Sequence, residues 1–318
     1  MTAFPEPVAG SRRRGSTGAE STASHLRPPL DELYRGFDHV HAAADPVHIV
    51  RRFADPADRE VVGFCAAGLA FGRVASVLQS IEALLAVMGP APAAFVRSFE
   101  VDRERRRFEP LVHRWIRGRD LVALMLVLRR MLRDHGSIEA FFAAGDKPET
   151  PNVYDALESF STRALETDLR QVYGARLPVR AGVGYFFPRP SRGSACKRLN
   201  LFLRWMVRRD AIDLGVWRTP APSRLVVPLD THVVRVGRCL RLTRRTSPGW
   251  NMAADITAAL RAVDGADPVR YDFSLCHIGM MNACGFNRPQ RDAQCPLRGV
   301  CRPGGRTPRS SPRPSGRR

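Results

Sequence analysis

The sequence predicts an all-α protein, and three observations support this fold class. Apolar residues recur every three or four positions along most of the chain, as they do on one face of a helix. No stretch alternates apolar and polar residues well enough to predict a strand, and no segment repeats. Apolar residues make up 44% of the 318 positions, which is typical of a globular protein with a large core.

Two segments of different composition bound the periodic pattern. Residues 1–29 are rich in Gly, Ser, Pro and Arg and lack periodicity, so we expect a disordered basic arm. Residues 302–318 carry six arginines and no acidic residue, and we expect a disordered tail there. For residues 30–301 we expect one helical domain of two lobes, the second of which contains the cysteine-rich segment 276–301.

Turn residues divide this domain into helices. Leu33, Tyr34 and Phe37 mark a first helix, which Asp45-Pro46 ends. Asp55-Pro56 starts another, because aspartate caps helices and proline fits their first turn. In chain order we expect helices over residues 30–44, 47–53, 56–70, 74–88, 108–116, 120–134, 137–144, 152–173 and 197–207, one that starts at 230, and two over 250–263 and 268–281.

The charge of the chain indicates a polyanionic partner. The net charge is +19, and about +11 remains on residues 30–301 once the +2 of residues 1–29 and the +6 of residues 302–318 are set aside. We expect double-stranded DNA rather than a membrane, because no long basic amphipathic helix stands out. A genome biased toward arginine would also raise the basic count, so charge alone does not decide this.

The compartment follows from what the sequence lacks. No apolar run reaches the ~18 residues that span a bilayer. The arginines at positions 12–14 are not followed by the apolar core of an export signal. We therefore expect a cytoplasmic, nucleoid-associated monomer whose seven cysteines are reduced thiols or metal ligands.

Lys197 and Asp230 are the candidate catalytic residues. Lys197 is one of only two lysines, with Lys147, among 50 basic residues, and it stands beside Arg198 at a helix start. That position and that neighbour disfavour the ammonium form, and a neutral lysine, unlike an arginine, is a nucleophile. Asp230 starts the next predicted helix, where it would hold a carboxylate rigidly. The alternatives are a solvated lysine that touches phosphate and an aspartate that only caps its helix.

Other residues around the lysine are candidates for contact with DNA. We expect the loop before Lys197 to contact phosphates, together with neighbouring basic residues; this set is Arg73, Arg192, Gly193, Ser194 and Arg198. Three aromatic residues are candidates to stack on an everted base, with core packing as the alternative; these are Tyr185, Phe187 and Trp205.

Four of the seven cysteines lie within 26 residues and suggest a metal site. Clustering of this kind in a reducing compartment is typical of an iron–sulfur or zinc site. Cys276 lies on an apolar helix face, so simple core packing is its alternative. The four candidate ligands are Cys276, Cys284, Cys295 and Cys301.

Four stretches carry a resemblance to a known family. They are Asp55–Phe64, Ala70-Phe71-Gly72-Arg73, Cys196–Arg208 and Pro228-Leu229-Asp230-Thr231-His232. Together they resemble an uncharacterised bacterial family that is described as similar to helix-hairpin-helix (HhH-GPD) DNA glycosylases. The wider superfamily, which includes endonuclease III, is a looser match. The resemblance implies the two-lobed helical fold of those enzymes.

The resemblance also implies a mechanism. Lys197 would attack C1′ of the damaged nucleotide and displace the base, while Asp230 would deprotonate the amine or stabilise the cationic sugar. β-Elimination would then nick the strand. A 4Fe–4S cluster is implied as well, to which Cys284, Cys295 and Cys301 would correspond, with Cys276 replacing the ligand that the endonuclease III spacing places near residue 291.

We therefore predict a base-excision repair DNA glycosylase with abasic-site lyase activity. One alternative is a DNA-binding protein without catalytic activity on the same scaffold. Another is RNA binding or RNA-base chemistry.

Overall fold

The computed structural model describes residues 17–38, 40, 45–176, 178–179, 181–280 and 295–301. This part of the chain is mostly helical, with a single two-stranded hairpin as its only sheet, so the predicted all-α class is confirmed. Within the described residues, no helix combines the length and the hydropathy that crossing a membrane requires.

The helices follow the chain with short connections. The first seven are α1 (Thr17–Arg35), α2 (Val47–Arg51), α3 (Pro56–Leu69), α4 (Val74–Met88), α5 (Pro92–Arg97), α6 (Val101–Phe108) and α7 (Gly118–His135). The next seven are α8 (Ile138–Ala143), α9 (Tyr154–Leu165), α10 (Arg170–Tyr173), α11 (Lys197–Val207), α12 (Thr231–Cys239), α13 (Trp250–Val263) and α14 (Asp272–Met280). Among the described residues, short 3₁₀ turns lie at Gly182–Tyr185, Pro190–Arg192 and Pro222–Arg224.

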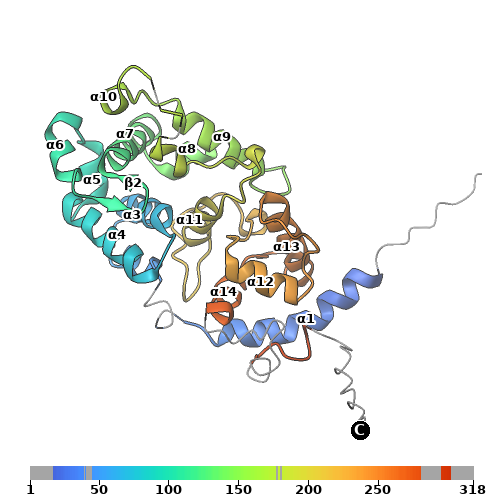
Figure 1. Cartoon of the computed structure of the whole chain (residues 1–318). Coiled ribbons are helices and arrows are strands. Elements are labelled where there is room, and N and C mark those ends of the chain that lie inside the picture. The colour runs from blue at the N-terminus through green and yellow to red at the C-terminus, as the bar shows by residue number, and fades with distance from the viewer. Residues whose placement is uncertain are drawn as a thin grey trace, which may run out of the picture.

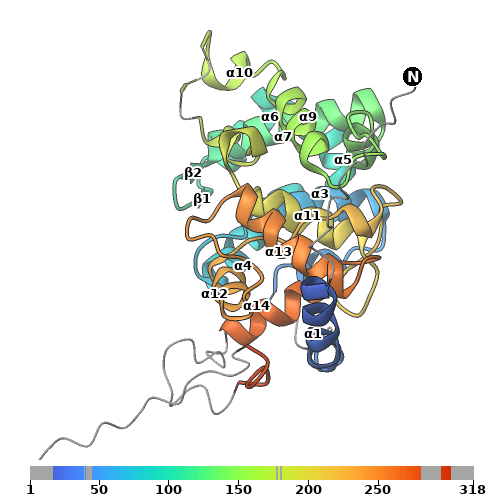
Figure 2. The same cartoon turned by 90° about the vertical axis from the view of Figure 1, so that its right-hand side faces the viewer.

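Helices α3 and α11 pack against each other in the middle of the molecule (Figures 1 and 2). Asp55 caps α3 as the sequence predicts, because its side chain accepts hydrogen bonds from the amides of Ala57 and Asp58. Gly63 of α3 faces α11 so closely that a Cβ there would lie 2.9 Å from Cε of Met206. The small residue therefore sets the distance between the two helices.

The other helices lie on the two sides of this pair. Helices α5 to α9 lie on one side, and α12, α13 and α14, with α1, lie on the other (Figures 1 and 2). Helices α12 and α14 pack face to face, and a Cβ at Gly279 of α14 would come within 2.6 Å of Cβ of His232 in α12. This close packing brings the N-terminus of α12 next to α14.

The N-terminal part of the structure differs from the prediction. Helix α1 begins at Thr17, so residues 17–29, expected as part of a disordered arm, are helical; residues 1–16 lie outside the described part. Leu26 and Leu30 are fully buried where α1 packs against α13, and Tyr271 donates a hydrogen bond to Asp31. These tertiary contacts override the poor helix propensity of the segment.

A hairpin replaces part of an expected helix. The prediction of a helix over residues 108–116 is wrong, because α6 ends at Phe108 and an antiparallel hairpin follows, with β1 (Val112–His113) and β2 (Ile116–Arg117). Arg114 and Trp115 form its two-residue turn, and Arg114 has a φ of 55°. Only His113 and Ile116 of this hairpin are buried, so tertiary contact rather than an alternating pattern specifies it.

Candidate functional site

Lys197 is the first residue of α11, as the sequence predicts. Its side chain is 36% exposed. Leu201 and Arg204 follow it at helical spacing, and all three line one cavity of about 750 Å³. Cys196, which directly precedes the lysine, has a φ of 48°, a left-handed conformation that costs a residue with a side chain about 1–3 kcal/mol. The start of this helix is therefore fixed by tertiary packing around the buried Cys196.

Asp230 is the N-cap of α12, and its two carboxylate oxygens have different partners. Oδ1 accepts hydrogen bonds of 2.8 Å from the amides of His232 and Val233. Oδ2 lies 3.9 Å from Nζ of Lys197. The capping bonds fix the orientation of the carboxylate, so capping and a role in the cavity are compatible here.

The cavity between the two residues is largely apolar. Lys197 comes from α11, Asp230 from the start of α12, Phe71 from the segment after α3, and Asp272, Cys276 and His277 from α14. The distance of 3.9 Å exceeds that of a hydrogen bond, so the amine and the carboxylate form an ion pair without direct proton sharing. A partly open apolar cavity with a few converging polar groups is typical of a small-molecule or nucleotide site.

Cys276 contacts the same carboxylate. Its thiol donates a hydrogen bond of 3.2 Å to Oδ2 of Asp230. Burial, followed by the charges of Asp230 and Asp272, raises the pKa of the Cys276 thiol far above its ordinary value. The cysteine is therefore a protonated hydrogen-bond donor and not a thiolate nucleophile.

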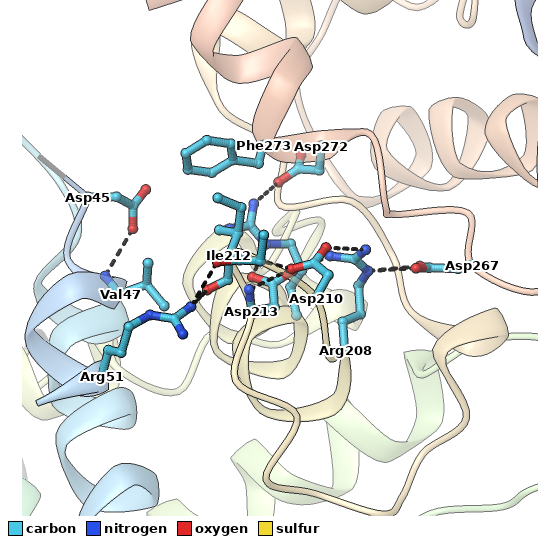
Figure 3. A network of polar contacts seen from close by, with 12 residues as sticks. Asp45, Val47, Arg51, Arg208, Asp210, Ile212, Asp213, Asp267, Asp272 and Phe273 are labelled. Carbon is cyan, nitrogen blue, oxygen red and sulfur yellow. Dashed lines mark hydrogen bonds and ion pairs between the residues drawn. The ribbon is translucent and has the colours of Figure 1, made fainter. Parts of the chain in front are cut away.

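Arg204 and Asp272, which line the cavity, belong to a buried network of ion pairs (Figure 3). Nη1 of Arg204 is 2.5 Å from Oδ2 of Asp272, the first residue of α14, and its Nε is 3.1 Å from Asp213. Arg208 continues the network to Asp213, and it also pairs with Asp267 at 2.8 Å. These bonds join the lysine helix α11 to α14, which carries Cys276.

The network also affects the protonation of its carboxyl groups. Burial raises the pKa of Asp213 and of Asp272 to about 6, although Arg204 opposes the shift in both. Among the described residues, Oδ1 of Asp272 and Nη2 of Arg204 are buried without a hydrogen-bond partner. Two residues that line the cavity therefore carry polar atoms whose hydrogen-bonding capacity is not used.

The five residues expected to contact DNA differ in their exposure to solvent. Arg73 is exposed at the start of α4, and Arg192 and Gly193 are exposed in the loop before α11. The loop amides of Arg192 and Gly193 donate to carbonyl groups within the loop, and Oγ of Ser194 accepts from the amide of Cys196. The amides of Ser191, Arg192, Gly193 and Cys196 therefore have partners inside the protein, which leaves them less suited to bind a phosphate.

Arg198 does not fit the expected phosphate contact. Its guanidinium donates to the carbonyl groups of Gly68 and Tyr185, and its central carbon lies 3.5 Å from the centre of the Tyr185 ring. Burial lowers the pKa of Arg198 to about 10. The Arg198 side chain therefore joins α11 to α3 and to the segment at Tyr185. Lys197 and Arg198 are neighbours in the sequence, but their side chains lie in different surroundings, and the sequence does not reveal this difference.

Two of the three aromatic residues expected in a base pocket belong to the core. Trp205 and Phe187 are at most 2% exposed, and the Phe187 ring stacks on Phe64 with centroids 5.5 Å apart. Tyr185 is half-buried and packs on Phe71, which lines the cavity together with Phe273. The apolar character of all these positions is the same in the sequence, so only packing distinguishes them.

The cysteines do not form the expected ligand set in the described part of the chain. No three Cys, His, Asp or Glu side chains gather there in a way that could hold a metal ion. Cys276 contacts Asp230, so it does not fit the role of fourth ligand. Cys295 and Cys301 are buried, and Cys284 lies outside the described residues.

Residues 45–281 match a family whose description is "Protein of unknown function (DUF2400)". The chain belongs to this family. The DUF2400 region includes every residue that lines the cavity, from Asp45 to Met280, and excludes Cys284, Cys295 and Cys301. The shared region thus contains the lysine site and, of the cysteine-rich segment, only residues 276–281. Neither the curated proteins nor the solved structures contain a match to the chain.

Proposed function

We propose that this protein is a DNA glycosylase with abasic-site lyase activity, with Lys197 as nucleophile and Asp230 as its partner. The observation that carries the proposal is the distance of 3.9 Å between Nζ of Lys197 and Oδ2 of Asp230 at the wall of one cavity. An amine and a carboxylate at this separation can exchange a proton once a reacting atom or a water lies between them.

The geometry supports a reaction in which atoms and charges balance. Asp230 first accepts a proton from the ammonium group of Lys197. The neutral amine then forms a bond to C1′ of the damaged nucleotide, the electron pair of the glycosidic bond leaves with the base, and the base takes the second proton that the nitrogen loses. Asp230 returns its proton to O4′ when the sugar ring opens to an iminium ion. Loss of a proton from C2′ then expels the 3′ phosphate, and water releases the lysine.

The surroundings favour this chemistry over a simple lysine–phosphate contact. A phosphate-binding lysine has no need of a carboxylate on a second helix, because that carboxylate repels the phosphate. Asp230 is only 15% exposed and is fixed by the α12 amides, as a group that stabilises a positive sugar should be. The net charge of +19 supports double-stranded DNA as the substrate.

The helix-hairpin-helix glycosylase type of fold is part of the same proposal. It rests on the two groups of helices on either side of α3 and α11 (Figure 2) and on the place of Lys197 as the first residue of α11. The proposed mechanism needs no metal ion, because its proton transfers use only Lys197 and Asp230.

Trapping with sodium borohydride tests the proposal, because reduction of the iminium ion joins enzyme and DNA covalently. Duplexes with one oxidised, alkylated, deaminated or abasic site should show which lesion gives an adduct. We expect an adduct at least with the abasic duplex. If no lesion gives an adduct while the protein binds duplex DNA with a steep salt dependence, the non-catalytic alternative holds instead.

A further inference from the structure

The turn of the β1–β2 hairpin carries a tryptophan that the proposed reaction does not use. Trp115 is 49% exposed, whereas the other three tryptophans, at positions 205, 217 and 250, are at most 6% exposed. An exposed tryptophan at the tip of a rigid turn offers a flat apolar surface to a partner.

The ring of Trp115 is held by other aromatic residues. Its centroid lies 4.9 Å from that of Phe71, at an angle of 31°, and 5.0 Å from that of Tyr185, edge to face. Buried His113 joins the hairpin to the Phe71 segment, since its Nε2 donates to the carbonyl of Phe71 at 2.9 Å and its Nδ1 lies 2.8 Å from Oγ of Ser80. The exposed ring is therefore fixed before any partner binds.

Basic residues flank this aromatic pair. Arg114 has a φ of 55°, a conformation that favours glycine, and its side chain lies over Gly72 with its guanidinium 6.0 Å from the Trp115 ring. A Cβ at Gly72 would lie only 2.8 Å from Nε of Arg114, so the glycine leaves the room that the arginine side chain occupies. Arg73 follows directly and is exposed.

The aromatic pair adjoins the residues of two hollows. Phe71 and Gly72 line the cavity that contains Lys197. Arg73 and Arg114, the two arginines that flank the pair, line a second hollow of about 680 Å³. Because Trp115 contacts Phe71, a nucleic-acid strand that places one nucleotide in the lysine cavity has the Trp115 ring and two arginines next to it.

We propose that Trp115 and Phe71 form a stacking platform for an unpaired nucleobase next to the lysine cavity, with Arg73 and Arg114 contacting the adjoining phosphates. The occupant is a base, because an exposed ring beside guanidinium groups matches the flat face and the charged backbone of a strand. This inference rests on the proposed function for its substrate, DNA, but not on catalysis.

Fluorescence provides a test that is independent of chemistry. The probe is a duplex with 2-aminopurine opposite a tetrahydrofuran abasic analogue, which has no aldehyde and cannot form an imine. We expect binding to quench the 2-aminopurine emission and to protect the exposed tryptophan from acrylamide. Trp115→Ala should abolish both effects and weaken binding of this duplex about tenfold, with less than about a twofold change for a fully paired duplex.

Two further variants serve as controls. Trp115→Phe keeps an aromatic face and should retain most of the affinity, and Val112→Ala removes an equally exposed apolar side chain from the same hairpin and should change nothing. The proposal is overturned if Trp115→Ala binds and quenches like the unaltered protein, or if the unaltered protein does not distinguish the two duplexes. A working platform without any borohydride adduct would contradict only the proposed catalysis.

Discussion

The thiol of Cys276 and the amine of Lys197 approach the same oxygen of Asp230. Sγ of Cys276 lies 3.2 Å from Oδ2, and Nζ of Lys197 lies 3.9 Å from it. Since the two amides of α12 occupy Oδ1, the thiol is the nearest donor to the oxygen that faces the lysine. Cys276 should therefore help to hold this oxygen in place beside the lysine.

Replacement of Cys276 by alanine removes this donor. A hydrogen bond to a charged group contributes about 1.5–3 kcal/mol, and this one orients the oxygen that faces Lys197, so its loss should slow abasic-strand cleavage about tenfold. Cys276→Ser keeps a donor and should restore most of the rate. Equal single-turnover rates for all three proteins would show that the contact has no part in the reaction.

Asp230→Asn removes the charge of this side chain but keeps its ability to cap α12. Asparagine caps helices as well as aspartate does, so the free energy of unfolding should change by less than about 0.5 kcal/mol, whereas Asp230→Ala should lose about 1 kcal/mol. Both variants should cleave abasic DNA at least about 100-fold more slowly, because neither accepts a proton. Urea unfolding and single-turnover cleavage measure the two effects, and an active Asn variant would exclude Asp230 from the reaction.

The same Asn variant tests the electrostatics of Cys276. The charge of Asp230 is the second cause, after burial, of the raised thiol pKa, so its removal should lower that pKa and increase the thiolate fraction. Iodoacetamide at pH 8.5, with peptide mass spectrometry, should label Cys276 several-fold faster in Asp230→Asn than in the unaltered protein. An unchanged labelling rate would mean that burial alone controls this thiol.

Arg204→Met should destabilise the protein strongly and in a pH-dependent way. It leaves Asp272 buried without its ion-pair partner and Asp213 with Arg208 alone, a loss of about 3–5 kcal/mol at pH 7. The folded-state pKa of both carboxyl groups, already about 6, should rise further without Arg204. Between about pH 4 and the raised folded-state pKa, the folded variant holds protons that the unfolded chain has released. The free energy of unfolding of the variant therefore falls as the pH rises through this range. The stability lost on replacing Arg204 should thus be smaller at pH 5 than at pH 7.

An exposed pair supplies the control for this prediction. Arg245 and Asp255 lie 2.8 Å apart with side chains 49% and 37% exposed, so Arg245→Met should cost less than about 1 kcal/mol at either pH. Urea unfolding at pH 5 and pH 7 compares the two variants. Equal losses for both at pH 7 would contradict a structural role for the buried network.

The sequence predicts the helix starts of the site better than the side chains that complete it. Lys197 and Asp230 both start helices as expected, because local capping and apolar spacing determine those positions. The contact of Cys276 with Asp230 depends on the packing of α14 against α12, which no local pattern encodes. The sequence makes Trp205 a candidate to stack on a base, but this side chain is fully buried. It lies in α11, a helix that is packed on several sides, so the sequence pattern does not show which of its apolar residues face the core.

The hairpin and α1 show the same limit. Two-residue strands are too short to alternate, so neither β1 nor β2 stands out in the sequence. Helix α1 contains Pro28 and Pro29 and still forms, because Leu26 and Leu30 are buried against the rest of the protein. In both cases tertiary contacts decide the local structure.

The most direct measurement of the central claim is the position of the covalent link to DNA. Borohydride-trapped complexes with an abasic duplex should be digested and the modified peptide identified by mass spectrometry. We expect the sugar on Lys197, loss of the adduct in Lys197→Gln, and a full yield in Lys147→Gln, the matched control at the only other lysine. An adduct on another residue, or one that persists in Lys197→Gln, would contradict the assignment of Lys197 as the nucleophile.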